Sequence, residues 1–215
     1  MPSTQIKICG ITRVEDASAI ADSGVDAVGL VFYRYSSRSV DCARAREIVA
    51  TLRPFTSAVA LFLDPTQEEV EEVLTNVPVD VLQFHGREPA RFCESFGRRW
   101  IKAAGMAGDA DITAIAAAYP GAAGMLVDAH PPGAAGGTGV SFDWERLPSE
   151  REFRLVLAGG LHAGNVADGI RRVRPDAVDV SSGVERTKGC KDAQLVREFI
   201  EEVRRGDRNT YSGHN

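Results

Sequence analysis

One type of junction between a helix and a strand occurs three times in the chain and constrains its fold more than any other feature. The three copies are Gly24-Val25-Asp26, Pro78-Val79-Asp80 and Arg174-Pro175-Asp176. Each copy ends a helical pattern and is followed by a short, continuous run of apolar residues. Strands that are apolar on both faces are typical of a parallel sheet covered by helices. The repeat therefore predicts a chain built from successive βα units.

The rest of the sequence alternates between the same two kinds of segment. Strands are predicted near residues 5–9, 26–32, 57–63, 79–84, 100–104, 123–128, 154–158 and 176–181. Helices are predicted near 13–23, 41–52, 66–76, 88–96, 109–119, 163–173 and 192–205, with a weaker pattern near 142–147. This alternation predicts a single α/β domain over residues 1–205, a (β/α)8 TIM barrel, although an open doubly wound sheet fits it too. The polar residues 206–215 are expected to form a frayed tail.

Composition argues against several classes of protein. The 215 residues include 25 Lys and Arg against 30 Asp and Glu, a net charge of −5, without a long basic block, so we expect no nucleic-acid partner. No apolar run approaches the roughly 20 residues that span a bilayer, and the first residues do not resemble a secretory signal. The cysteines, at positions 9, 42, 93 and 190, lie far apart, which argues against a metal site or a disulfide framework. We expect a cytoplasmic protein with reduced thiols.

Three loops rich in glycine or serine follow the predicted sixth, seventh and eighth strands. The first, 131–139, contains Gly136 and Gly137; the second contains Gly159 and Gly160; the third is Ser181-Ser182-Gly183. Glycines let backbone N–H groups surround an anion, and (β/α)8 enzymes often bind phosphate after strands seven and eight. Each loop alone could be an ordinary turn. Three such loops at successive strand ends predict a phosphate site.

Few titratable side chains lie at the predicted carboxyl ends of the strands. They are Cys9, His85, Asp128 and Asp179. In a closed barrel, Cys9 and Asp128 could face each other across a substrate, and a thiol base opposite a carboxyl acid suits proton transfer at carbon. Each residue also has a structural explanation: a free cysteine is often core, and the others could hold turns or backbone groups.

Arg38 belongs to the segment that joins the predicted second strand to its helix. This segment lies at the same edge of the sheet, where a guanidinium could bind a carboxylate with two hydrogen bonds. A solvated loop arginine is the structural alternative.

Motifs along the whole domain resemble those of the phosphoribosylanthranilate isomerase family of tryptophan biosynthesis. They occur in order from residue 6 to about 200. The motifs are KICGIT (7–12), S-x-R-x-V (36–40), LQFHG (82–86), IKA (101–103), LVD (126–128), GGTG (136–139), LAGGL (157–161) with Asn165-Val166, DVSSGVE (179–185) and G-x-KD (189–192). Each motif is moderately specific, and the ordered set is highly specific.

The resemblance implies a (β/α)8 barrel that isomerises N-(5′-phosphoribosyl)anthranilate to 1-(2-carboxyphenylamino)-1-deoxyribulose 5-phosphate. This Amadori rearrangement needs no cofactor and no metal. The family's general acid corresponds to Asp128 and its general base to Cys9. Arg38 corresponds to the residue that holds the anthranilate carboxylate, Asp179 to one near the nitrogen, and the three small-residue loops to the phosphate site. His85 is expected among the substrate-binding residues, and members of the family are monomers or homodimers.

Two positions depart from the family's pattern. Ser37 stands where proline is usual, and Phe84 replaces a more common leucine; we expect at most weaker substrate positioning from either change.

Other functions remain open from the residues alone. They are another phosphosugar isomerase or epimerase, a non-catalytic binder of phosphorylated ligands, a structural subunit of a pathway assembly, or a redox-sensing role for Cys9. A related two-substrate barrel enzyme would use paired aspartates, and position 9 carries a cysteine instead.

Overall fold

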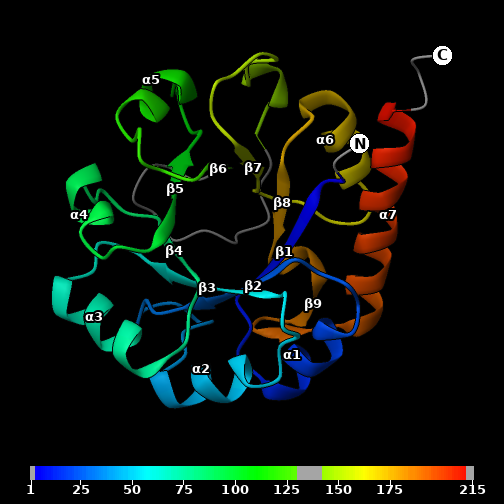
Figure 1. The fold of residues 1–215 in the computed structure, drawn as a ribbon. Coiled ribbons are helices and arrows are strands. Elements are labelled where there is room, and N and C mark those ends of the chain that lie inside the picture. The colour runs from blue at the N-terminus through cyan, green and yellow to red at the C-terminus, as the bar shows by residue number, and fades with distance from the viewer. Residues whose placement is uncertain (1–2, 130–141, 212–215) are drawn as a thin grey trace.

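The structure, a computed structural model, describes residues 3–129 and 142–211 as a closed barrel of eight parallel strands surrounded by helices (Figure 1). The barrel strands are β1 (Gln5–Cys9), β2 (Ala27–Val31), β3 (Ser57–Phe62), β4 (Val81–Phe84), β5 (Arg99–Gly105), β6 (Met125–Asp128), β7 (Leu155–Leu157) and β8 (Ala177–Val180). The helices are α1 (Val14–Ala21), α2 (Cys42–Val49), α3 (Gln67–Asn76), α4 (Ala90–Glu94), α5 (Ile112–Ala117), α6 (Val166–Val173) and α7 (Ala193–Tyr211).

The predicted (β/α)8 barrel is confirmed, and the open sheet is wrong because β1 pairs with β8 as well as with β2. Each predicted strand overlaps an observed one. The weak helical pattern at 142–147 becomes a single 3₁₀ turn, Trp144–Arg146. A small antiparallel pair that the pattern did not predict, β9 (Glu185–Thr187) with β10 (Cys190–Lys191), follows β8.

The three repeated aspartates all perform the same structural task. Asp26 accepts a hydrogen bond from the backbone N–H of Ile6, Asp80 from Ala58 and Asp176 from Leu155, each at 2.8 Å. In each case the aspartate precedes one strand and binds the backbone of the strand before it in the chain. The repeat in the sequence is therefore a device that aligns neighbouring parallel strands.

Side chains alternate between two sides of each strand. Ile6 and Ile8 of β1 belong to the large apolar core that packs the strands against the helices. Cys9 belongs instead to a small separate cluster with Val31 and Leu61. Lys7 lies on the same side of β1 as Cys9 and is also buried. One end of the barrel interior is thus apolar but the layer beside it is charged.

The expected frayed tail from residue 206 is partly wrong, because α7 continues to Tyr211. Gly206 is buried, and a Cβ there would lie 3.1 Å from the Cα of Ala167 in α6. Asp207 is only 8% exposed and accepts hydrogen bonds from the backbone N–H of Thr4 at 3.2 Å and from its hydroxyl at 2.6 Å. A polar side chain thus joins the last helix to the start of the chain. Residues 212–215 lie outside the described part.

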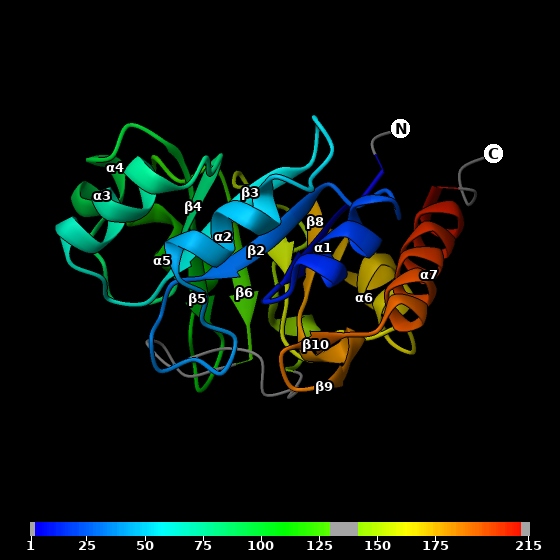
Figure 2. The same ribbon diagram turned by 90° about the horizontal axis from the view of Figure 1, so that it is seen from below.

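The barrel has two distinct ends. The start of β1 and the end of α7 lie at one end, and the β9–β10 pair lies at the other (Figure 2). None of the helices in residues 3–129 and 142–211 combines the length and apolar character needed to cross a membrane.

Replacing Asp207 with alanine is expected to lower the free energy of unfolding by about 2–3 kcal/mol, because the substitution leaves buried donors of Thr4 without their acceptor. Urea unfolding followed by circular dichroism measures the change. Glu201→Ala, on an exposed position of the same helix, is the matched control and should change stability by less than about 0.5 kcal/mol. Equal effects of the two substitutions would show that the hydrogen bonds of Asp207 to Thr4 add no stability.

Candidate active site

A cleft opens at the carboxyl ends of the barrel strands. Nine of the residues predicted from the sequence line it: Cys9, Arg38, His85, Asp128, Gly159, Gly160, Asp179, Ser181 and Ser182. These residues come from strands all around the barrel, so they meet in one cleft only because the barrel closes.

One predicted residue among those that the structure describes does not line the cleft. Gly183 lies behind it, where a Cβ would be 1.9 Å from the carbonyl oxygen of Leu161, so only glycine lets the two loops approach. Gly136 and Gly137 fall in 130–141, outside the described residues. Of the three loops predicted to bind phosphate, the second and third border the described cleft.

The backbone at Gly159 and Gly160 explains why glycine is needed there. Their φ angles are +80° and +65°, in a region that other residues rarely adopt. A Cβ at Gly159 would also lie 2.7 Å from the backbone nitrogen of Ala129. This close approach brings the ends of β6 and β7 together beside Asp128.

Cys9 ends β1 beside two charged residues. Its register partner on β2 is Gly29, where a Cβ would lie 2.7 Å from the Cys9 Sγ and 3.0 Å from the Lys7 Nζ. Lys7 is also the register partner of Asp179, and the two form a buried ion pair at 3.0 Å. A thiol, an ammonium and a carboxylate therefore share the barrel interior below the cleft.

These three groups perturb one another. Burial raises the pKa of the Cys9 thiol, Lys7 opposes that rise, and Asp179 adds to it. Burial also raises the pKa of Asp179 against the pull of Lys7. For Lys7, burial alone would lower the pKa, but Asp179 and Cys9 together raise it above its ordinary value. The ammonium is therefore charged at neutral pH, whereas the thiol holds its proton more tightly than a solvated one.

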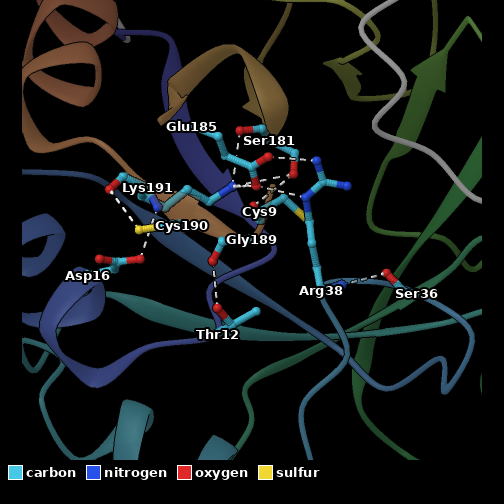
Figure 3. Close-up of polar contacts among 10 residues, drawn as sticks. All are labelled: Cys9, Thr12, Asp16, Ser36, Arg38, Ser181, Glu185, Gly189, Cys190 and Lys191. Atoms are coloured by element: carbon cyan, nitrogen blue, oxygen red, sulfur yellow. Dashed lines mark hydrogen bonds and ion pairs between the residues drawn. The ribbon is translucent and has the colours of Figure 1, made fainter. Parts of the chain in front are cut away.

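Arg38 is bound by a carboxylate that the sequence analysis did not single out. Its Nε and Nη2 donate to the two carboxylate oxygens of Glu185, each at 2.7 Å, and both side chains are buried (Figure 3). Lys191 donates to Glu185 at 2.9 Å and to the carbonyl of Ser181 at 3.0 Å. The Nη1 of Arg38 points away from Glu185 (Figure 3). Glu185 and Lys191 thus fix the guanidinium at the wall of the cleft.

In the group formed by Arg38, Glu185 and Lys191, the neighbouring opposite charges oppose the effect of burial on each pKa. Burial alone would raise the pKa of Glu185, but hydrogen bonds and charge from Arg38 and Lys191 bring it below its ordinary value. Burial lowers the pKa of Lys191 against the pull of Glu185.

Gly10 makes the position of Arg38 possible. Its φ is +75°, and a Cβ there would lie 2.5 Å from the Arg38 Cδ and 3.2 Å from the Ser181 Oγ. The Ser181 hydroxyl in turn donates to the carbonyl of Cys9 at 3.0 Å. The glycine after the cysteine therefore lets Arg38 and the β8 loop pack directly against the end of β1.

His85 at the end of β4 is placed by a residue that the sequence analysis did not single out as functional. The Gln83 Nε2 lies 2.5 Å from the His85 Nε2, and Gln83 is fully buried in the barrel. Gln83 is therefore a buried hydrogen-bonding partner of the His85 ring.

Lys7 and Gln83 share a sequence signal that could have found them. Each is a polar residue two positions before a cleft residue in an otherwise apolar strand, and the period of two places it on the same face. Glu185 and Lys191 carry no comparable local pattern.

The two departures from the family's pattern have structural outcomes. Ser37 is exposed, and its loop is held by a hydrogen bond from the Arg38 N–H to the Ser36 hydroxyl at 3.1 Å. Phe84 points away from the cleft into an aromatic group with Phe62, Phe96 and Trp100. Its extra volume therefore fills the helix side of β4.

Among residues 3–129 and 142–211, no group of three or more His, Cys, Asp and Glu side chains is arranged to hold a metal ion. The chemistry of the described cleft is that of a thiol, carboxyl groups, an imidazole and an arginine.

A closed parallel barrel with its cleft at the carboxyl ends of the strands defines a (β/α)8-barrel protein of the enzymatic type. Residues 6–202 match the profile of the N-(5′phosphoribosyl)anthranilate (PRA) isomerase family. The chain belongs to this family.

Individual relatives agree with the profile. The chain is 55% identical to N-(5′-phosphoribosyl)anthranilate isomerase of Pseudomonas paraeruginosa over 204 residues, covering 95% of this chain and 97% of the relative. It is 51% identical to the enzyme of Alcanivorax borkumensis over 211 residues, with the same coverage. The crystal structure of the Thermotoga maritima enzyme superimposes with a TM-score of 0.86 at 40% identity, covering 94% and 98% of the two chains.

One related structure contains a ligand. It is phosphoribosylanthranilate isomerase in complex with reduced 1-(o-carboxyphenylamino)-1-deoxyribulose 5-phosphate, with a TM-score of 0.79 at 36% identity and coverage of 94% and 98%.

Glu185→Gln is expected to lower the free energy of unfolding at pH 7 by about 2–4 kcal/mol, because two buried cations lose their shared carboxylate. The folded-state pKa of Glu185 lies below its ordinary value, so its contribution is present above about pH 4.5 and is lost as the pH falls through the lowered pKa. The difference between wild type and variant should therefore shrink in acid, as measured by urea unfolding at pH 7 and pH 3.

Glu47→Gln is the control for this experiment. Glu47 pairs with Arg44 at 2.8 Å on the exposed surface, so its loss should change stability by less than about 1 kcal/mol. A pH-independent effect of Glu185→Gln would contradict the charge-based role of Glu185.

Proposed function

We propose that this chain isomerises N-(5′-phosphoribosyl)anthranilate to 1-(2-carboxyphenylamino)-1-deoxyribulose 5-phosphate without a cofactor. The observation that carries the proposal is the cleft in which Cys9, Asp128 and Arg38 meet two small-residue loops. Family membership and the ligand-bound relative agree with this substrate and product class.

In the first step Asp128, in its protonated form, gives its proton to the ribose ring oxygen. The bond between that oxygen and C1′ breaks, and the electron pair of the anthranilate nitrogen forms a C1′–N double bond. Asp128 ends β6 and lines the cleft, so its proton can reach a ligand there. The product of this step is an open-chain Schiff base.

In the second step the thiolate of Cys9 removes the C2′ proton. The electrons of the C–H bond form a C1′–C2′ double bond, and the Schiff-base nitrogen accepts the displaced pair. The resulting enolamine becomes the ketone when C1′ gains a proton and the C2′ hydroxyl loses one. The overall reaction moves hydrogen from C2′ to C1′ and is redox-neutral.

Binding groups surround this chemistry. Arg38 holds the anthranilate carboxylate through the edge of its guanidinium that Glu185 leaves open. Asp179 and His85 line the cleft near the reacting atoms. Phosphate is held by Gly159, Gly160, Ser181 and Ser182 with Gly183 behind them, and we propose that Gly136 and Gly137 complete this site.

The working unit is a monomer or a homodimer. A related structure from Thermotoga maritima presents monomers of a dimeric phosphoribosylanthranilate isomerase.

Cys9→Ala and Asp128→Asn are each expected to lower kcat by about 10²–10⁴-fold, the usual effect of removing a general base or acid. Loss of phosphoribosylanthranilate fluorescence, with substrate generated in situ, measures the rate. Cys42→Ala removes a thiol on α2 that does not line the cleft and should keep normal turnover. Near-normal turnover of either cleft variant, or an inactive but folded wild type, would sink the proposal.

Arg38→Met is expected to remove the enzyme's preference for a substrate that carries the anthranilate carboxylate. With wild type, a substrate in which aniline replaces anthranilate should show a kcat/KM about 10–100-fold lower, since a charge-assisted hydrogen bond is lost. With Arg38→Met the two substrates should be used almost equally. Arg34→Met, an exposed arginine in the same loop, should discriminate as wild type does. Retained discrimination in Arg38→Met would assign the carboxylate to another residue.

A further inference from the structure

We propose that Lys7 is a positioning residue whose ammonium group lies beside the Cys9 sulfur and stabilises its thiolate, while Asp179 holds that ammonium in place. The inference rests on the proposed role of Cys9 as the base of the reaction.

Geometry places the ammonium at the thiol. Lys7 and Cys9 are two residues apart on β1 and therefore point to the same side of the strand. Both end over Gly29, since the position of a missing Cβ lies 2.7 Å from Sγ and 3.0 Å from Nζ. A larger residue at position 29 would occupy the space in which the two groups meet.

A buried lysine at this point has no packing reason. Desolvating an ammonium inside a barrel is unfavourable, and an apolar side chain would fill the same volume more readily. The ion pair with Asp179 at 3.0 Å offsets that penalty. An ammonium can donate three hydrogen bonds, so one donor can bind Asp179 and another can still reach the thiol. The pair thus keeps a positive charge next to Cys9 inside the protein.

Other charged groups around Cys9 are differently engaged. Lys191 from β10 binds Glu185 and the Ser181 carbonyl, and Arg38 binds Glu185 through two nitrogens. Both cations are therefore largely compensated by Glu185 of β9. Asp128 from β6 and His85 from β4 line the same cleft. Lys7 differs in that its charge is shared between Asp179 and the thiol itself.

The arrangement suits a base that must gain a proton during the reaction. The Lys7 ammonium favours the thiolate form of Cys9. Burial has the opposite effect, because it favours the neutral thiol. The carboxylate of Asp179 sets how much of the ammonium's charge the sulfur experiences. Removing Lys7 and removing Asp179 should therefore have opposite effects on the thiol.

The test is the pH dependence of alkylation of Cys9 by iodoacetamide, followed by mass spectrometry of the peptide that contains it. Only the thiolate reacts, so the rate below the pKa falls about tenfold for each unit by which the pKa rises. Lys7→Met should slow alkylation at pH 7 about tenfold or more. Asp179→Asn should accelerate it. The partly exposed Cys42 is an internal control whose rate should not change.

Lys7→Met leaves Asp179 buried without its partner and could therefore misfold. A third variant tests the inference without that problem. Lys7→Met combined with Asp179→Asn removes both charges and should react more slowly than Asp179→Asn alone. Equal rates for those two variants, or shifts of Lys7→Met and Asp179→Asn in the same direction, would overturn the inference. The kcat/KM profile of Asp179→Asn against pH should move toward acid relative to wild type.

The readout separates this inference from the proposed function. If Cys9→Ala keeps its activity while the alkylation shifts are found, Lys7 tunes a thiol that is not the base. If Cys9→Ala is inactive and the alkylation rates are unchanged, Cys9 is the base but Lys7 does not assist it.

Discussion

Pairing of the first strand with the last is the interaction on which the site depends. The hydrogen bonds between β1 and β8 set residues 5–8 against 177–180. That register places Lys7 opposite Asp179 and brings the β8 loop to the end of β1, where the Ser181 hydroxyl binds the carbonyl of Cys9. Closure therefore builds the ion pair, the β8 loop and the thiol environment in one step.

Closure also explains how an acidic protein can gather cationic side chains beside its cleft. Net charge is −5, yet Lys7, Arg38 and Lys191 are all buried near the cleft. Each is paired with a carboxylate, Asp179 or Glu185. The net charge of the chain therefore does not show that buried cations lie beside the cleft. Breaking one member of such a set leaves another buried without compensation, so a substitution at any of these positions is expected to destabilise the fold.

The sequence predicted the strands, the barrel and most of the cleft, because apolar runs and glycine loops reflect local chemistry. It did not predict the partners of Arg38 and Lys7, because those contacts join residues 147 and 172 positions apart. The tail was misjudged for a related reason. Residues 206–211 look polar, but Gly206 packs on α6 and Asp207 binds Thr4, contacts that only the folded barrel creates.

The aspartate junctions carry a consequence for how the barrel assembles. Asp26, Asp80 and Asp176 each tie a strand to the one before it, which covers the pairs β1–β2, β3–β4 and β7–β8. Gly124, which precedes β6, has no side chain to do this for β5–β6. Three strand pairs thus carry their own protection against a one-residue slip, which would turn apolar side chains to the wrong face. The β2–β3, β4–β5 and β6–β7 pairs likewise show no such bond among the described residues, so a slipped alignment is opposed less directly at these four pairs.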